Sequence, residues 1–259
     1  MRQVARACGD ILRHHFRRRD LCVTTKQNDY DIVTTADKES ERQALALIRE
    51  RHPDHGVLTE ESGADLLSSP WQWVIDPLDG TTNFSTGFPY FNVSVGLKHR
   101  GETVMGTVLA PVLGECFEAV RGQGAVLNGN PIAPSAVTAL SQAVVTTGFP
   151  YDKATTADNN LPQASRVTTR VRALRCLGSA ALDISYVAAG FLDGYWEISL
   201  HEWDVCAAEL IAQEAGAVTR RYRGDRGVSL LAAAPGIASP LLALLTCGSH
   251  VLSPQEKKR

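Results

Sequence analysis

Residues 73–84 read WVIDPLDGTTNF, and this stretch decides how the chain is interpreted. An apolar run ends at Asp76, where Pro77 removes a backbone donor, and the glycine after Asp79 permits a sharp turn. We therefore expect a strand that ends at Asp76 and a rigid turn that carries both carboxylates. At such a turn the carbonyl of Leu78 has no strand partner. Two carboxylates and a free carbonyl around one point suit a hard cation such as Mg²⁺.

The hydroxyl and amide side chains of Thr81, Thr82 and Asn83 are typical of helix N-caps. We expect a short helix to begin here with its free amides directed back toward the turn, which is a place for a phosphate group. The alternative is purely structural, because Asp76 and Asp79 can form an Asx-type turn with Thr81 as its cap.

Two further acidic sites lie at predicted element ends. Glu60 and Glu61 follow the strand-like sequence HGVLT, and Asp204 lies in the first turn of a helix that Gly216 ends. The glutamates alone would be read as a solvated surface pair, and Asp204 as a helix cap, a role that can coexist with metal binding. If these three sites converged without a cation, their charges would repel one another.

Composition excludes several classes of protein. With 26 Lys and Arg against 28 Asp and Glu, the formal net charge is -2, and no basic stripe with interleaved aromatic residues suggests nucleic-acid binding. The longest apolar stretch is broken by two prolines, so we expect no membrane span. The six cysteines show no C-x-x-C pair or zinc-like spacing, and we expect reduced, mostly buried thiols.

The Arg-rich first twenty residues allow two interpretations. A mitochondrial transit peptide is one, but Asp10 and the lack of serine argue against it. Apolar residues at helical spacing favour an ordinary amphipathic helix with its arginines toward water. We therefore expect a cytoplasmic protein.

Patterning along the chain predicts an α/β fold with an α+β first half. A second helix is expected between residues 32 and 53, with Thr35 or Asp37 as its cap, followed by an antiparallel meander over 91–127. Alternating strands and helices are expected after it, with a polar stretch between residues 150 and 170 and one strand and one helix at the end. We expect two domains: residues 1–133, with the antiparallel sheet and most of the acidic ligands, and residues 134–259, an α/β unit that supplies Asp204 and the substrate pocket.

Four motifs in order resemble the inositol monophosphatases, a family of Mg²⁺-dependent, lithium-sensitive sugar-phosphate phosphatases. They are TEES at 59–62, WVIDPLDGTTNF, GSAALDISYVAAGFLDGYWE at 178–197 and WDVCAAELIAQEAGA at 203–217. The order and spacing agree along nearly the whole chain, and the wording looks most like the bacterial branch. The resemblance implies a layered α-β-α-β-α sandwich of the sugar-phosphatase type and a homodimer.

The same resemblance implies a ligand set. Glu60, Asp76 and the Leu78 carbonyl would hold one Mg²⁺, while Asp76, Asp79 and Asp204 would hold a second, with a weaker third position near Asp37. Thr81 and Glu60 would orient the attacking water. The amides of Gly80 and Thr81 would bind the phosphate, and the substrate hydroxyls would meet Asp79, Gly178, Ser179, Ala180 and Glu197.

Without the resemblance, Glu197 would be read as an exposed strand glutamate. The sequence contains no G-x-S-x-G elbow, P-loop lysine or C-x₅-R loop, so we expect water to attack directly, with no covalent phosphoenzyme. The expected reaction is hydrolysis of inositol 1-phosphate. Two alternatives stay open: a related phosphatase acting on histidinol phosphate, fructose 1,6-bisphosphate, NADP⁺ or 3′-phosphoadenosine phosphate, and a regulatory binding protein that does little catalysis.

Overall fold

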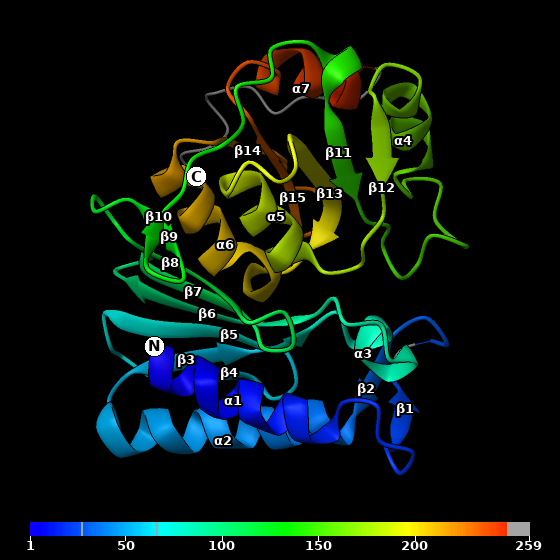
Figure 1. Ribbon diagram of the computed structural model, residues 1–259. Coiled ribbons are helices and arrows are strands. Elements are labelled where there is room, and N and C mark those ends of the chain that lie inside the picture. Colours follow the sequence, from blue (N-terminus) through cyan, green and yellow to red (C-terminus); the bar gives the residue numbers. More distant parts are fainter. Residues whose placement is uncertain (27, 66, 248–259) are drawn as a thin grey trace.

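The computed structural model describes residues 1–26, 28–65 and 67–247. Figure 1 shows five layers: α1 with α2, a large sheet, α5 with α6, a smaller sheet, and α4 with α7. The predicted layered sandwich is therefore confirmed. The helices are α1 Arg2–His15, α2 Thr35–Arg51, α3 Thr81–Thr86, α4 Leu161–Thr168, α5 Ala180–Ala188, α6 Glu202–Ala215 and α7 Ala238–Thr246.

The larger sheet has eight strands in the order β10-β9-β8-β7-β6-β5-β3-β4. Its neighbours pair antiparallel except β3 and β5, which run parallel. The predicted meander corresponds to β6 through β9. The strands are β3 Gly56–Thr59, β4 Gly63–Asp65, β5 Trp71–Asp79, β6 Asn92–His99, β7 Glu102–Ala110, β8 Glu115–Val120, β9 Ala125–Leu127 and β10 Asn130–Pro131; β1 Val23–Thr25 and β2 Ile32–Thr34 form a separate pair.

The smaller sheet has five strands in the order β12-β11-β13-β15-β14, and β11 runs parallel to both of its neighbours. The chain ends with two strands and a helix, where one strand and a helix were predicted. Helix α4 was missed because its segment is short and polar. The strands are β11 Val144–Thr147, β12 Ala173–Arg175, β13 Gly194–Leu200, β14 Val218–Arg223 and β15 Val228–Ala233, and a 3-10 turn covers Leu140–Gln142.

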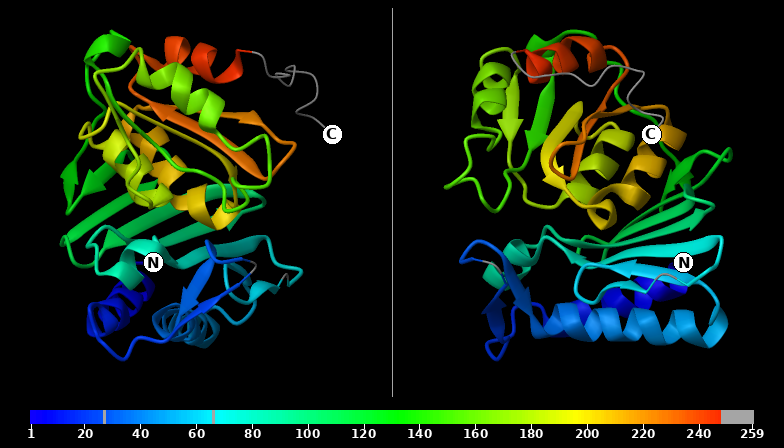
Figure 2. Two further views of the ribbon diagram at one scale, coloured as in Figure 1. Left: turned by 90° about the vertical axis from the view of Figure 1, so that its right-hand side faces the viewer. Right: turned by 180° about the vertical axis from the view of Figure 1, so that it is seen from behind.

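Helices α5 and α6 pack between the two sheets, as both views in Figure 2 show. One core cluster joins Phe117 of the larger sheet to Leu182 of α5, Ile211 of α6 and Leu230 of the smaller sheet. The larger sheet is formed by residues before the predicted boundary at 133 and 134, and the smaller sheet by residues after it. Helices α5 and α6, which lie between the sheets, contact both of them. The division into two domains stays a prediction.

The strand that carries the acidic turn does not end at Asp76, so that prediction was wrong. β5 continues to Asp79, and its pairing with β6 shifts register between these two residues. A bulge of this kind redirects side chains without ending the strand. The bulge, rather than a strand end, therefore presents the two carboxylates.

The prediction of mostly buried thiols was also wrong. All six cysteines are free, but only Cys8 and Cys206 are buried, whereas Cys22, Cys176 and Cys247 are exposed. Across residues 1–26, 28–65 and 67–247, no helix is both long enough and apolar enough to cross a bilayer.

The closest approach between the larger sheet and α6 requires a glycine. A Cβ at the buried Gly106 of β7 would lie 2.6 Å from the carbonyl oxygen of Ala207, which belongs to the helix backbone and cannot yield. We predict that Gly106→Ala lowers the free energy of unfolding by about 1–3 kcal/mol, the usual cost of overpacking. Urea denaturation measures the change.

Gly56→Ala is the matched control, because a Cβ at this buried strand glycine meets only ordinary contacts of 3.5 Å or more. Equal stability of the two variants would show that α6 does not press against β7 as described.

Candidate active site

Asp79 lies where strands β5 and β6 of the larger sheet meet the start of α5. One of its carboxylate oxygens accepts hydrogen bonds from Asn92 Nδ2 at 2.7 Å, from Ser179 Oγ at 2.8 Å and from the Ala181 amide at 2.8 Å. The other accepts from the Ala180 amide at 3.2 Å. The carboxylate thus caps the N-terminus of α5, where the helix dipole favours a negative charge.

Asp76 and Leu78 form the bulge of β5. Oδ1 of the buried Asp76 accepts a hydrogen bond from the Leu78 amide at 2.9 Å, which fixes the turn. The predicted free carbonyl of Leu78 instead lies 3.1 Å from the hydroxyl of Thr81. Each carbonyl oxygen has a second lone pair, so this contact leaves one for another ligand.

Helix α3 begins at Thr81, as predicted, with Gly80 as its N-cap at φ 97°. A Cβ on Gly80 would lie 3.1 Å from the Tyr90 carbonyl oxygen and 3.2 Å from that of Gly178, so only glycine fits. The turn at Gly178 is held beside α3 by Asn83, whose Nδ2 donates to the Leu177 carbonyl at 2.7 Å.

The Thr81 hydroxyl also lies 3.0 Å from Oδ1 of Asp37, a buried residue. Asp37 is the third residue of α2, and its other oxygen accepts from the amide and hydroxyl of Thr34. The N-cap of α2 is therefore Thr34, where Thr35 or Asp37 was expected. Asp37 and Thr81 form one hydrogen-bonded pair, which sequence reasoning did not identify.

Glu60 is paired with a lysine. Lys26 Nζ donates to Glu60 Oε1 at 2.9 Å and to Glu61 Oε1 at 2.5 Å. The two glutamates are therefore not a solvated surface pair. The sequence motif KQNDYD gave no signal that its lysine reaches the acidic cluster.

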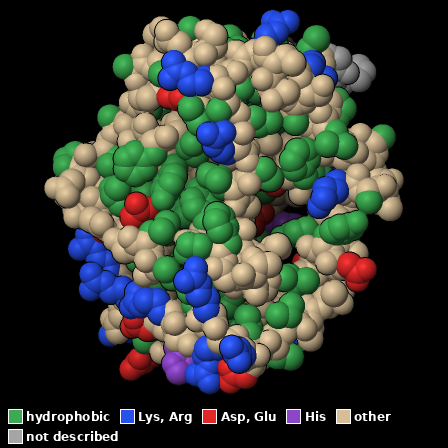
Figure 3. All heavy atoms as spheres, turned by 45° about the vertical axis from the view of Figure 1, so that its right-hand side comes forward, with side chains coloured by type: hydrophobic (Ala, Val, Ile, Leu, Met, Phe, Trp, Pro, Cys, Tyr) green, Lys and Arg blue, Asp and Glu red, His purple; other side chains and the backbone are tan. Residues whose placement is uncertain are grey.

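Asp204 lies in the first turn of α6, as predicted, and accepts a hydrogen bond from the His201 amide at 2.7 Å. The His201 ring stacks on Trp203 with ring centroids 4.6 Å apart. The Asp204 carboxylate, 3.7 Å from the ring Nδ1 of His201, raises the pKa of that ring. Figure 3 shows a hollow between the two halves of the molecule with acidic and histidine side chains inside it.

The carboxylates face a shared, poorly hydrated space. Burial, and then the nearby charge of Asp204, raises the pKa of Glu60 to about 7 even against the opposing charge of Lys26, and raises that of Asp79 to about 6. Burial, Glu60, Asp79 and Asp204 together raise the pKa of Asp76 well above its usual range. The charge of Asp204 thus acts on Glu60, Asp76 and Asp79.

Repelling carboxylates and a backbone carbonyl form the donor set that a hard divalent cation needs. Nevertheless, in the described part of the chain no three His, Cys, Asp or Glu side chains form a ready coordination shell. Lys26 occupies one side of Glu60, and four protein donors surround Asp79. The chemistry of the residues fits Mg²⁺, and ligation requires Lys26 to release Glu60 or share it.

Glu197 of β13 lies on the other side of the site and is not exposed. It accepts a hydrogen bond from Tyr195 at 2.9 Å, and burial raises its pKa to about 8. Its carboxyl group lies directly against Gly148, where any Cβ would overlap it. A glycine at the end of β11 therefore makes room for the one polar side chain expected to meet a polyol.

The fold and these contacts place the chain among the metal-dependent sugar phosphatases of layered α/β architecture. The sequence pattern of the inositol monophosphatase family matches residues 1–250, and the chain belongs to this family.

Individual relatives carry two kinds of name. "Nus factor SuhB" of Pasteurella multocida is 40% identical over 245 residues, which cover 93% of this chain and 92% of the relative. "Inositol-1-monophosphatase" of Synechocystis is 42% identical over 193 residues, 74% of this chain and 67% of the relative. The solved inositol monophosphatase from Anabaena superposes with a TM-score of 0.83 at 35% identity, covering 98% and 95% of the two chains.

The raised pKa values predict how stability depends on pH. The pKa of a carboxyl group in the unfolded chain is about 4, so Glu60 and Asp79 stabilise the fold below that pH and lose this contribution as pH rises through about 6 to 7. With chelator present, we predict that the wild-type protein loses about 2 kcal/mol of unfolding free energy between pH 5.5 and pH 8. Urea denaturation at the two pH values measures the loss.

Asp76→Asn removes the most buried of these charges and should make that loss smaller. Mg²⁺ at pH 8 should restore stability to the wild type and not to the variant. Asp54→Asn, an exposed residue, is the control. If Asp76→Asn lost as much unfolding free energy between pH 5.5 and pH 8 as the wild type does, repulsion among the buried carboxylates would not be the cause of the pH dependence.

Proposed function

We propose that the protein hydrolyses a phosphate monoester, with inositol 1-phosphate as the preferred substrate and Mg²⁺ as the required metal. The observation that carries this proposal is the set of four acidic side chains Glu60, Asp76, Asp79 and Asp204: burial and the charge of Asp204 raise the pKa values of the other three, and Glu60 and Asp79 add to the rise at Asp76. A buried acidic cluster of this kind is costly unless a cation compensates it. Membership of the inositol monophosphatase family supports the phosphatase activity.

We assign the metal side of the site as follows. Glu60, Asp76 and the Leu78 carbonyl hold one Mg²⁺, and Asp76, Asp79 and Asp204 hold a second. When bound, Mg²⁺ offsets the charge of the phosphate and makes a nearby water a stronger nucleophile.

Thr81 and Glu60 orient the attacking water. The hydroxyl of Thr81 lies 3.0 Å from Asp37, so Asp37 is placed to accept its proton and leave the threonine oxygen free to receive a hydrogen bond from that water. Asp37 therefore acts through Thr81, in addition to lying near the weaker third metal position. The amides of Gly80 and Thr81 bind the phosphate oxygens.

The polyol side consists of Glu197 and the turn at Gly178, Ser179 and Ala180. The turn is joined to Asp79 by the Ser179 and Ala180 hydrogen bonds. These bonds fix the position of the residues proposed to bind the substrate hydroxyls relative to a proposed metal ligand. The sequences GSAALD and DGYWE favour inositol-like monoesters over histidinol phosphate, for which a GGDC-like turn is expected. Fructose 1,6-bisphosphate, NADP⁺ and 3′-phosphoadenosine phosphate are the competing substrates.

A regulatory role is the second candidate, and the name of a relative favours it. The P. multocida protein is called a Nus factor at 40% identity along nearly the whole chain. The complete acidic set of this chain supports catalysis, and a regulatory surface elsewhere on the fold is compatible with it. We further propose a cytoplasmic homodimer.

The direct test is phosphate release from inositol 1-phosphate, histidinol phosphate, fructose 1,6-bisphosphate and NADP⁺, with Mg²⁺ and with chelator. We expect Mg²⁺-dependent release with the highest kcat/KM for inositol 1-phosphate. A higher kcat/KM for one of the other three would change the assigned substrate and leave the proposed Mg²⁺-dependent hydrolysis standing. No release from any of the four would reject the catalytic proposal and favour the regulatory one.

Glu197→Gln tests the polyol assignment at pH 9, above the Glu197 pKa of about 8, because at that pH it keeps the shape of the side chain and removes its charge. We expect kcat/KM for inositol 1-phosphate to fall about tenfold or more, the scale of one hydrogen bond to a charged group. The Mg²⁺ dependence should be unchanged. Equal kinetics of variant and wild type across the four substrates would remove Glu197 from the pocket.

A further inference from the structure

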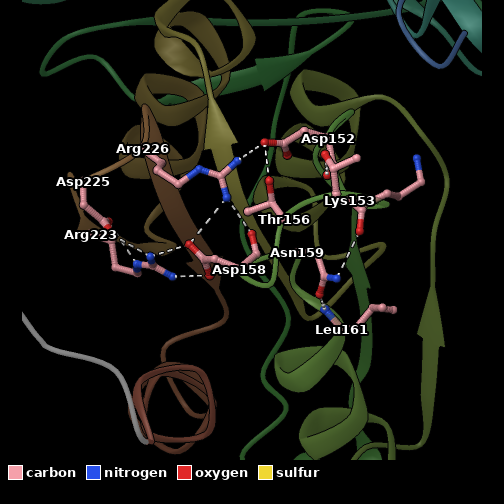
Figure 4. Close-up of polar contacts among 10 residues, drawn as sticks. Asp152, Lys153, Thr156, Asp158, Asn159, Leu161, Arg223, Asp225 and Arg226 are labelled. Carbon is pink, nitrogen blue, oxygen red and sulfur yellow. Dashed lines mark hydrogen bonds and ion pairs between the residues drawn. The ribbon is translucent and has the colours of Figure 1, made fainter. Parts of the chain in front are cut away.

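Residues 149–159 connect β11 to α4 without a helix or a strand, and we call this segment the arm. Backbone hydrogen bonds from Lys153 to Pro150 and from Thr155 and Thr156 to Asp152 form turns within it. Arg223, the last residue of β14, and Arg226, in the turn between β14 and β15, reach it from a distant part of the sequence (Figure 4).

The strongest contact is bidentate. The two terminal nitrogens of Arg223 donate to the two carboxylate oxygens of Asp158 at 2.9 and 2.6 Å. The Arg223 side chain is only 12% exposed, so water screens this pair less than an ordinary surface ion pair. Arg223 also contacts Asp225 on its own turn, which fixes its orientation.

Arg226 forms the second attachment. It donates to Asp152 Oδ2 at 2.5 Å and to the backbone carbonyl of Asp158 at 2.7 Å. Thr156 donates to the same oxygen of Asp152 at 2.9 Å, which closes the bend of the arm (Figure 4). Arg223 at the end of β14 and Arg226 in the turn after it therefore hold the arm at both Asp152 and Asp158.

Asn160 fixes the base of the arm beside the polyol pocket. Its Nδ2 donates to the Gly148 carbonyl at 2.6 Å and to the Thr147 hydroxyl at 2.8 Å, and its Oδ1 accepts from the buried Trp196. Gly148 is the residue against which the Glu197 carboxyl lies. A displaced arm would therefore move the wall of the Glu197 pocket.

The tip of the arm reaches the opposite side of the site. Lys153 Nζ lies 4.5 Å from the centre of the Tyr30 ring, a cation–π contact with the loop that carries Lys26. The Lys26 amide donates to the Asp31 carbonyl at 2.7 Å, which keeps Tyr30 and Lys26 on one closed loop.

We propose that Arg223 and Arg226 are positioning residues that hold the arm beside the site, so that the arm and the Gly148–Glu197 wall determine which phosphate monoesters are accepted. This inference rests on the proposed function. Neither arginine touches the metal-binding side chains, so the arm governs recognition of the polyol rather than the chemical step.

The test compares Arg226→Ala and Arg223→Lys with Arg220→Ala. Arg220 is the matched control, because it is an exposed arginine of β14 whose side chain contacts only the neighbouring Thr219 carbonyl. For inositol 1-phosphate we expect the first two variants to raise KM about five- to tenfold with kcat within about twofold. For para-nitrophenyl phosphate, which has no polyol, KM should stay within about twofold. Unchanged KM values in folded variants would overturn the proposal.

A second readout does not depend on activity. Trypsin cuts after Lys153, and mass spectrometry of that single bond reports whether the arm is held. We expect faster cleavage in Arg226→Ala and partial protection in Arg226→Lys, with Arg220→Ala equal to the wild type. If Arg226→Ala fails to fold, Asp152→Asn removes the same contact from the other side.

The two readouts separate the possible failures. Without turnover by the wild type, the proposed function falls and takes the specificity proposal with it, while the cleavage rates still decide whether the arginines hold the arm. Faster cleavage with unchanged KM would show that the arm is held but does not select substrates.

Discussion

The carboxylate of Asp79 joins parts of the molecule that are far apart in the sequence. It is carried by the bulge of β5, receives a hydrogen bond from Asn92 of β6, and receives three more from Ser179 and the first amides of α5. The larger sheet and the helix layer therefore meet at one charged group. Its neighbours Asp76, Glu60 and Asp204 share the same poorly hydrated space, so the geometry that joins the layers also concentrates negative charge.

Backbone amide donors and one lysine surround this concentration of negative charge. Helix α5 directs its first amides at Asp79, α6 does the same with the His201 amide at Asp204, and Lys26 reaches Glu60 from a separate loop. Each contact compensates part of the charge without removing it, as the raised pKa values of Glu60 and Asp79 show. The remaining charge is what makes a divalent cation the natural partner in the proposed function.

Sequence patterns were sufficient for the α/β class, the meander, the start of α3 and the place of Asp204 in the first turn of α6, because each depends on local periodicity or on cap residues. The layered sandwich was implied by the family resemblance. Sequence patterns were insufficient for three features. The continuation of β5 to Asp79 depends on pairing with β6, the reach of Lys26 depends on a fold contact, and α4 is short and polar. The Asp37–Thr81 pair spans 44 residues, and no local rule connects its members.

The arm shows the same limit. Residues 149–159 and the turn after β14 carry no motif, and their relation becomes visible only when Asp158 is found beside Arg223, the last residue of β14, and Arg226 of that turn. The four motifs carry the residues that we assign to the metals, the phosphate and the polyol. The segments without motifs are where members of one fold can differ in what they accept.

The most direct test of this account is proton release on addition of Mg²⁺ to the metal-free protein in weakly buffered solution at pH 6.5. Because Glu60 and Asp79 have pKa values of about 7 and about 6, both are partly protonated there, and cation binding must displace those protons. The account predicts saturable release of on the order of one proton per chain, falling toward zero at pH 9. Mg²⁺ binding without proton release at pH 6.5, or no Mg²⁺ binding at either pH, would contradict the claim that a buried acidic cluster is built around a cation.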